Sequence, residues 1–293
     1  MCKRNLILPI LAFIFLLPAE GCNSNKARIS LPSKDYDLNN PAKLILGDEL
    51  AEISGISYYP RDSSVFAISD ETGYLYKIHL NRRFLIEKWK FNEKHDFEDV
   101  LQLDSSFYVL ESNGNIEKLS FAPNGEKGKD RDTVFNRRTI FPANNESKNE
   151  FESLYYDDER KGIVMICKDC EEDDTDVTTA WLYDPVSDAY TKSFYKIQLD
   201  VIAKQIGEDK IKFRPSAAAV NPLTKDVWVI SSTNKLIVVL DRKGNIKDVY
   251  TLNPAIFLMP EGITFTPSGV LMISNEAVDK YGSASLLIFK PKK

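Results

Sequence analysis

The sequence is poor in the residues that most catalytic and transition-metal sites need. Its 293 residues include only two histidines, four cysteines and three tryptophans, and the formal net charge is -5. A net negative charge gives no electrostatic basis for binding nucleic acid. Two histidines leave little scope for a catalytic triad, and no Gly-x-Ser-x-Gly elbow occurs. The chain is nevertheless long enough, and at 43% hydrophobic apolar enough, to bury a substantial core.

The longest apolar run lies at the N-terminus and is too short to cross a membrane comfortably. Lys3 and Arg4 precede thirteen almost wholly apolar residues, 6–18, and Gly21-Cys22 follows. This order predicts a secretory signal over residues 1–21. It resembles a bacterial lipoprotein signal, which implies lipid on Cys22, although Glu20 stands where a small residue is usual. We expect a linker over 22–40 and a β-propeller domain over 41–293. The protein is expected to be a monomer that is anchored to a membrane of the cell envelope and faces the periplasm or the cell surface. An ordinary secreted protein is the alternative.

The remaining cysteines form a C-x-x-C pair, Cys167 and Cys170. A thioredoxin-type site would need a βαβ context, and a zinc site would need a second pair of ligands. In an oxidising compartment the simplest interpretation is a local disulfide, and two free thiols are the alternative.

A pattern recurs five times along the chain. Each copy has an acidic or polar residue, an apolar strand, a turn, a second apolar strand and a polar or acidic end. The copies begin at Glu52, Glu98, Glu152, Ser216 and Glu261, which are 46, 54, 64 and 45 residues apart. A third strand follows each pair, and a fourth is expected at 84–91, 139–141, 190–197 and 246–252. Four short antiparallel strands at this period predict a propeller blade.

The fifth copy has no fourth strand of its own. The isolated apolar segment 42–46 lies before the first copy, so we expect it to pair with 286–289 and close the ring. Closure removes exposed sheet edges. Five blades are therefore expected, with six as the alternative if the insert 200–212 contains strands. That insert is more typical of a short helix.

Four segments of the repeats resemble the SdiA-regulated family, the YjiK-like exported bacterial proteins. They are Glu52-Ile53-Ser54-Gly55-Ile56, residues 69–76 (SDETGYLY), Phe151-Glu152-Ser153-Leu154-Tyr155 and Pro260-Glu261-Gly262-Ile263. The resemblance spans roughly residues 45–290 and implies a β-propeller without a settled biochemical activity. A weaker resemblance to phytase-like and lactonase-like propellers implies metal in the central channel. Asp99 replaces an expected Gly and Ser216 an expected Glu, which departs from a symmetric site.

Antiparallel topology brings the repeated acids together. The start of the first strand and the end of the second lie at the same end of a sheet, and the first strand lines the channel. We therefore expect Glu52, Glu98, Glu152 and Glu261 to form a metal-binding ring, with Ser216 in the fourth copy. Hard oxygen ligands favour calcium or magnesium, and calcium is the expected cofactor. The candidate ligand-binding residues at the same mouth are Asp70, Glu71, Glu111, Lys168, Asp169, Asn275 and Glu276. Equally, each Glu could be architectural, accepting backbone N–H bonds.

The leading hypothesis is a propeller that binds a small-molecule or envelope-protein ligand and a cation. A calcium-dependent hydrolase of a phosphoester or lactone is the second, with Lys168 and His95 as candidate functional groups. A scaffold exposing the apolar loop 254–259 is the third. We expect His79 to be a partly buried structural residue. The acidic run 171–176 lacks the glycine and spacing of an EF-hand and is expected to be a solvated charge cluster.

Overall fold

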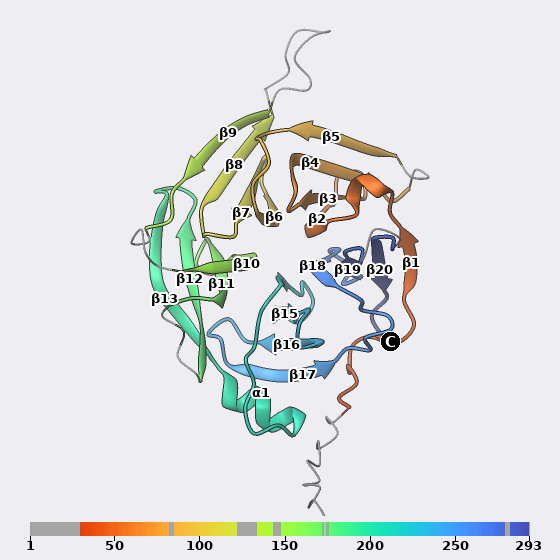
Figure 1. Ribbon diagram of the computed structural model, residues 1–293, viewed down its shortest axis with the longest axis vertical. Helices are drawn as coiled ribbons and strands as arrows, with labels where there is room; N and C mark the ends of the chain where they lie inside the picture. Colours follow the sequence, from red (N-terminus) through yellow and green to blue (C-terminus); the bar gives the residue numbers. More distant parts are fainter. Residues whose placement is uncertain are drawn as a thin grey trace, which may run out of the picture.

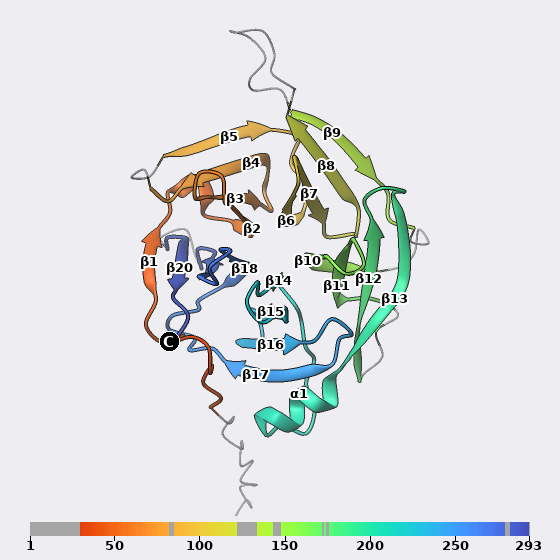
Figure 2. The ribbon, with the colours of Figure 1, turned by 180° about the vertical axis from the view of Figure 1, so that it is seen from behind.

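The molecule is a ring of five sheets around a central channel (Figures 1 and 2). The computed structural model describes residues 30–81, 85–121, 134–142, 148–171, 173, 176–278 and 282–292. Within this part of the chain, twenty strands form five four-stranded antiparallel sheets. The all-β, five-bladed propeller is confirmed. The insert after the third blade contains the helix α1 (Leu199–Ile206) and adds no sixth blade.

The strands follow the chain order from the channel outwards in blades 1 to 4. Blade 1 comprises β2 (Ile53–Tyr59), β3 (Ser64–Ser69), β4 (Thr72–His79) and β5 (Ile86–Lys90). Blade 2 comprises β6 (Phe97–Leu103), β7 (Ser106–Glu111), β8 (Ile116–Phe121) and β9 (Val134–Thr139). Blade 3 comprises β10 (Glu150–Asp157), β11 (Gly162–Asp169), β12 (Val177–Asp184) and β13 (Ala189–Gln198). Blade 4 comprises β14 (Ala217–Val220), β15 (Val227–Ser231), β16 (Leu236–Leu240) and β17 (Ile246–Thr251). Blade 5 comprises β18 (Pro260–Phe265), β19 (Leu271–Asn275), β20 (Ser285–Phe289) and β1 (Ala42–Ile45).

The burial of each strand explains why the second strands of the blades were easier to predict than the outermost ones. The second strands β3, β15 and β19 are buried throughout, because sheets pack on both of their faces. They accordingly read as continuous apolar runs. The outer strand β9 is mostly exposed and polar, so its sequence carries little strand signal. The expected strand at 139–141 was therefore displaced: the structure has β9 at Val134–Thr139, and Phe141 packs into the core.

The N-terminal strand closes the ring as expected. β1 pairs antiparallel with β20, with Ala42 opposite Ile288 and Ile45 opposite Ser285. The closure starts earlier in the chain than the sequence indicated, because the described part of the expected linker is packed against the propeller. Tyr36 is buried, its ring lies 5.3 Å from that of Trp228, and its hydroxyl donates to the Gly269 carbonyl at 2.7 Å. Residues 30–40 therefore form a strap across blades 4 and 5.

A buried carboxylate joins the inner strands of blades 2 and 3. Asp99 Oδ2 accepts the Leu154 N–H at 2.8 Å and Asp99 Oδ1 accepts the Val100 N–H at 2.8 Å. Burial raises the pKa of Asp99 well above its ordinary value. A Cβ on Gly55 would come within 2.2 Å of Asp99 Oδ1, so the glycine in blade 1 makes room for this side chain. The departure from the repeat at Asp99 is thus a structural link between blades.

The helix α1 covers the outer part of blades 3 and 4. Ile202, Ala203 and Ile206 are buried in the hydrophobic cluster that these blades share. The helix ends at Gly207, whose φ of 77° is the left-handed conformation that favours glycine. None of the helices in the described residues has the length and apolarity to span a bilayer.

Candidate functional site: a charged channel mouth

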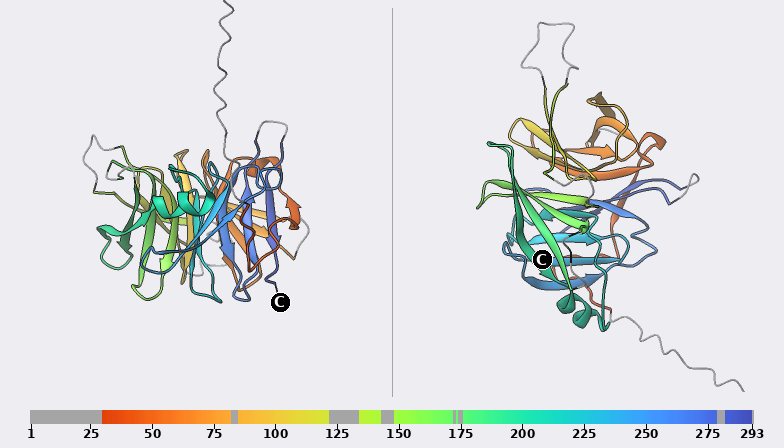
Figure 3. Two further views of the ribbon diagram at one scale, coloured as in Figure 1. Left: turned by 90° about the horizontal axis from the view of Figure 1, so that it is seen from below. Right: turned by 60° about the vertical axis from the view of Figure 1, so that its left-hand side comes forward.

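A cavity of about 500 Å³ opens at the channel end where the innermost strands begin. Figure 3 shows the strands running between the two ends of the ring. We call the cavity the mouth. Its lining comprises Ser54, Asp70, Asp96, Glu98, Glu150, Glu152, Lys168, Arg214, Ser216, Ser232, Thr233, Lys235, Leu258, Met259, Glu261 and Glu276.

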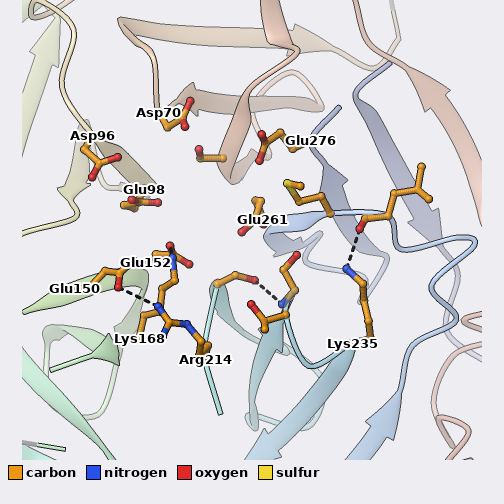
Figure 4. Close-up of a pocket in the computed structure, with 16 residues that line it drawn as sticks. Asp70, Asp96, Glu98, Glu150, Glu152, Lys168, Arg214, Lys235, Glu261 and Glu276 are labelled. Carbon is orange, nitrogen blue, oxygen red and sulfur yellow. Dashed lines mark hydrogen bonds and ion pairs between the residues drawn. The ribbon is translucent and has the colours of Figure 1, made fainter. Parts of the chain in front are cut away.

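One side of the mouth consists of carboxylates from blades 1, 2 and 5. Asp70 follows β3, Asp96 and Glu98 lie at the start of β6, and Glu261 and Glu276 belong to blade 5 (Figure 4). No basic residue from these three blades lines the described cavity. Asp70 Oδ1 is buried and has no hydrogen-bond partner among the described atoms. We call this set the acidic wall.

Four of the five carboxylates of the acidic wall have raised pKa values. Burial, and then the Asp96 charge, raise the pKa of Glu98 to about 8. Burial, and then a hydrogen bond with Glu52, raise the pKa of Glu276 to about 9. Burial likewise raises the pKa of Glu261 to about 7 and that of Asp70 to about 6. Crowded, desolvated carboxylates disfavour their own ionisation, and a bound cation would relieve this.

The opposite side, from blades 3 and 4, is charge-compensated. Lys168 pairs with Glu150 at 2.7 Å and also with Glu152, while Arg214 pairs with Glu150 at 3.1 Å. Lys235 donates to the Leu258 carbonyl at 2.8 Å, and burial lowers its pKa. The charges of the mouth are therefore segregated. One wall has carboxylates without basic side chains from the same blades, and on the other wall carboxylates form ion pairs with basic side chains.

A disulfide brackets the residues that build the compensated wall. Cys167 and Cys170 are bonded, as expected, and enclose Lys168 and Asp169. Lys168 reaches into the mouth, whereas Asp169 pairs with Arg214 at 2.9 Å and Lys212 at 2.8 Å. The cysteine sulfurs lie close to an Asp173 carboxylate oxygen, but the disulfide occupies both sulfurs. The pair is therefore structural and not a metal site in this form.

The structure brings together some of the predicted residues and not others. Glu98, Glu152, Glu261, Ser216, Asp70, Lys168 and Glu276 all line the mouth. Glu52, a predicted metal ligand, is not part of the lining, but it is hydrogen-bonded to Glu276, which is. The other predicted residues outside the lining are Glu71, Glu111, Asp169 and Asn275. Ser216 replaces the repeated Glu and donates to the Pro260 carbonyl at 2.9 Å, which makes its role architectural.

Side-chain direction explains the residues outside the lining. Successive side chains of a strand point to opposite faces, so proximity to the mouth does not ensure contact with it. Glu111 turns into blade 2, where Arg138 pairs with it and Asn115 donates to it at 3.0 Å. Asn275 is buried and donates to the Ile256 carbonyl at 2.9 Å. Glu71 is exposed and pairs with Lys94.

Four charged residues of the mouth were not predicted from the sequence: Asp96, Glu150, Arg214 and Lys235. Asp96-Phe97-Glu98 and Glu150-Phe151-Glu152 share one pattern, in which two acids flank a phenylalanine at the start of an inner strand. Side chains two residues apart in a strand point to the same face, so this alternation could have revealed both acids. Arg214 and Lys235 come from loops of blade 4, and their approach to the mouth depends on tertiary structure.

The other candidate groups lie elsewhere. His95 is exposed and does not line the mouth, and His79 is buried and paired with Glu87, as a structural histidine would be. In the loop 254–259 Phe257 is fully buried, whereas Leu258 is 43% exposed, so only part of the predicted apolar loop is open to solvent. Within the acidic run, Asp173 accepts the Thr179 N–H at 2.7 Å and is therefore bonded rather than solvated.

Comparison with known proteins gives a family and a fold. The family model described as SdiA-regulated matches residues 28–278. No curated protein matches the sequence.

Among solved structures, the chain is similar to a glutaminyl cyclase from Myxococcus xanthus, with 12% identity, a TM-score of 0.56 and coverage of 86% of this chain and 96% of that one. It is also similar to regucalcin, a calcium-binding protein from Agrobacterium tumefaciens strain C58, with 11% identity, a TM-score of 0.51 and coverage of 90% and 97%. At these identities the likeness supports the fold alone.

Proposed function

This chain belongs to the SdiA-regulated family, and we propose that it binds a divalent cation, calcium foremost, on the acidic wall of its channel mouth. The proposal is supported mainly by the composition of the acidic wall. Five carboxylates line one side of a cavity, and no base from their blades accompanies them. The buried Asp70 Oδ1 has no partner, which leaves one ligand atom ready for a cation.

The chemistry of the donors favours a hard cation. Carboxylate oxygens are the preferred ligands of calcium, which accepts six to eight oxygens in flexible geometry. Neither histidine lines the described mouth, and the disulfide sulfurs are outside it. Among the described lining residues the Met259 thioether is the one soft donor, against five carboxylates, so the donor set favours a hard cation. Hydroxyl groups of Ser54, Ser232 and Thr233 could complete the shell. Regucalcin, a calcium-binding protein of similar fold, is consistent with this choice.

The compensated wall argues for binding rather than hydrolysis. Lys168, the candidate general base, is held in ion pairs with Glu150 and Glu152, and His95 is outside the mouth. A lysine whose amino group is held by two carboxylates is poorly placed to act as a general base. The mouth is best described as a cation site with room for a further ligand.

The expected location is the cell envelope. The signal over 1–21 and the lipid-accepting Cys22 lie outside the described residues, and we propose both from the sequence. The propeller would then be held at a membrane surface by the segment that continues into the strap.

Thermal unfolding tests the cation proposal. Binding to the folded state at about 100 times the dissociation constant adds about 2.7 kcal/mol. For a domain of this size that raises the melting temperature by roughly 5–10 °C. We expect calcium to produce this rise in chelator-treated protein and the double substitution Glu98→Gln with Glu261→Gln to remove most of it.

The matched control is Glu159→Gln, an exposed acid in the β10–β11 turn at the far end of blade 3. It should preserve the full rise. An undiminished calcium response in the double variant, or no response in the parent, would contradict the proposal.

A further inference from the structure

We propose that the mouth faces a membrane: the partner of this end of the propeller is the surface of an anionic bilayer, against which the N-terminal anchor holds it. The inference rests on the lipid anchor at Cys22 proposed above. It adds the orientation of the site, which follows from where the strap leaves the propeller.

The strap joins the propeller at the mouth end. The Leu31 carbonyl accepts the Thr251 N–H at 2.9 Å, and the Leu31 N–H donates to the Thr251 hydroxyl at 2.9 Å. Thr251 is the last residue of β17 and lies opposite Leu236. The residue before Leu236 is Lys235, which lines the mouth. Leu31 therefore lies at the mouth end of the propeller, on the outer edge of blade 4.

From Leu31 the strap runs away from the mouth. Lys34 pairs with Asp248, which lies three residues earlier in β17. The Tyr36 hydroxyl then reaches the Gly269 carbonyl in the turn between β18 and β19, at the far end of blade 5. β1 returns towards the mouth, and the Leu46 N–H donates to the Ala284 carbonyl at 2.9 Å. Followed backwards towards Cys22, the chain therefore leaves the propeller at the mouth end.

The tether is short compared with the propeller. Cys22 precedes Leu31 by nine residues. A chain of that length reaches about 30 Å when fully extended, and its mean end-to-end distance as a flexible coil is about 17 Å. Strands of six to eight residues are roughly 20–26 Å long. To turn the far end to the bilayer, the tether would have to span that length almost fully stretched, which is entropically unfavourable.

The tether itself is basic. The segment 23–31 contains Lys26 and Arg28 and no acidic residue, whereas Lys34 is paired with Asp248. Basic residues near an anionic bilayer are attracted to its surface. A negative surface potential also concentrates divalent cations next to the bilayer. A mouth that faces the bilayer would be exposed to this higher cation concentration, which favours cation binding on the acidic wall.

Energy transfer to the bilayer tests the orientation. The full lipidated protein is placed in vesicles containing an anionic lipid and a headgroup acceptor dye. A donor dye is attached through Ala255→Cys, an exposed position in the loop before β18 at the mouth end. The matched variant is Leu223→Cys, which is 58% exposed in the turn between β14 and β15 at the far end.

Because the two ends are about 20 Å apart, we expect transfer from position 255 to be at least about twofold more efficient than from 223. Equal transfer, or stronger transfer from 223, overturns the orientation. Cys22→Ser should abolish vesicle association. Association that survives in this variant refutes the anchor and with it the inference, while calcium binding in solution reports on the mouth independently.

Discussion

Cation binding at the mouth should release protons, because the acidic wall is partly protonated at neutral pH. With pKa values of about 8 for Glu98, about 9 for Glu276 and about 7 for Glu261, the first two carry a proton at pH 7 and the third carries about half of one. A divalent cation stabilises the ionised carboxylates and displaces those protons. We expect about two protons to leave for each calcium bound at pH 7, so affinity should rise roughly a hundredfold per pH unit there.

Isothermal titration in two buffers with different ionisation enthalpies counts these protons directly. Glu276→Gln removes one of the groups and should lower the count by about one, while also weakening the affinity. Glu71→Gln is the control, because Glu71 is a nearby acid that is exposed and pairs with Lys94 outside the mouth. Calcium binding without measurable proton release would refute the reasoning, since it would place the cation away from the protonated wall.

Two further predictions concern the fold. Tyr36→Ala should destabilise the protein by about 3–5 kcal/mol in denaturant unfolding, because it deletes a buried ring and the hydrogen bond to Gly269; a loss below 1 kcal/mol would show that the strap contributes little. Glu117 is fully buried beside Glu111, and burial raises its pKa from 4.5 to about 7. The folded protein therefore binds the extra proton, and between pH 4.5 and 7 this group alone should lower the stability of the parent by up to about 3 kcal/mol as pH rises, in addition to the effect of the other carboxyls whose pKa is raised. Glu117→Gln should remove the contribution of Glu117 to this slope, and an unchanged pH profile in that variant would contradict the assignment.

Local patterns were sufficient to predict the architecture. The second strands β3, β15 and β19 are apolar because they are covered on both faces, and the recurrence of the strand pattern along the chain indicated five blades. The lone segment 42–46 was correctly paired with β20, since a propeller without a fourth strand in its last blade leaves an open edge. The outer strand β9 was misplaced because polar, exposed residues carry no strand signal of that kind.

The site was only partly predictable. The repeat shows where along a strand each acidic residue lies, but it does not show which residues surround that side chain. Glu98 and Glu261 reach the same cavity, whereas Glu111, equally close to a strand end, is bound by Arg138 inside its own blade. The separation of an acidic wall from a compensated one depends on Lys168 and Arg214, which approach Glu150 from two different blades. Sequence alone determined the periodic burial that builds the ring. Only the tertiary structure decided which charges meet across it, because ion pairing and desolvation depend on distances between residues far apart in the chain.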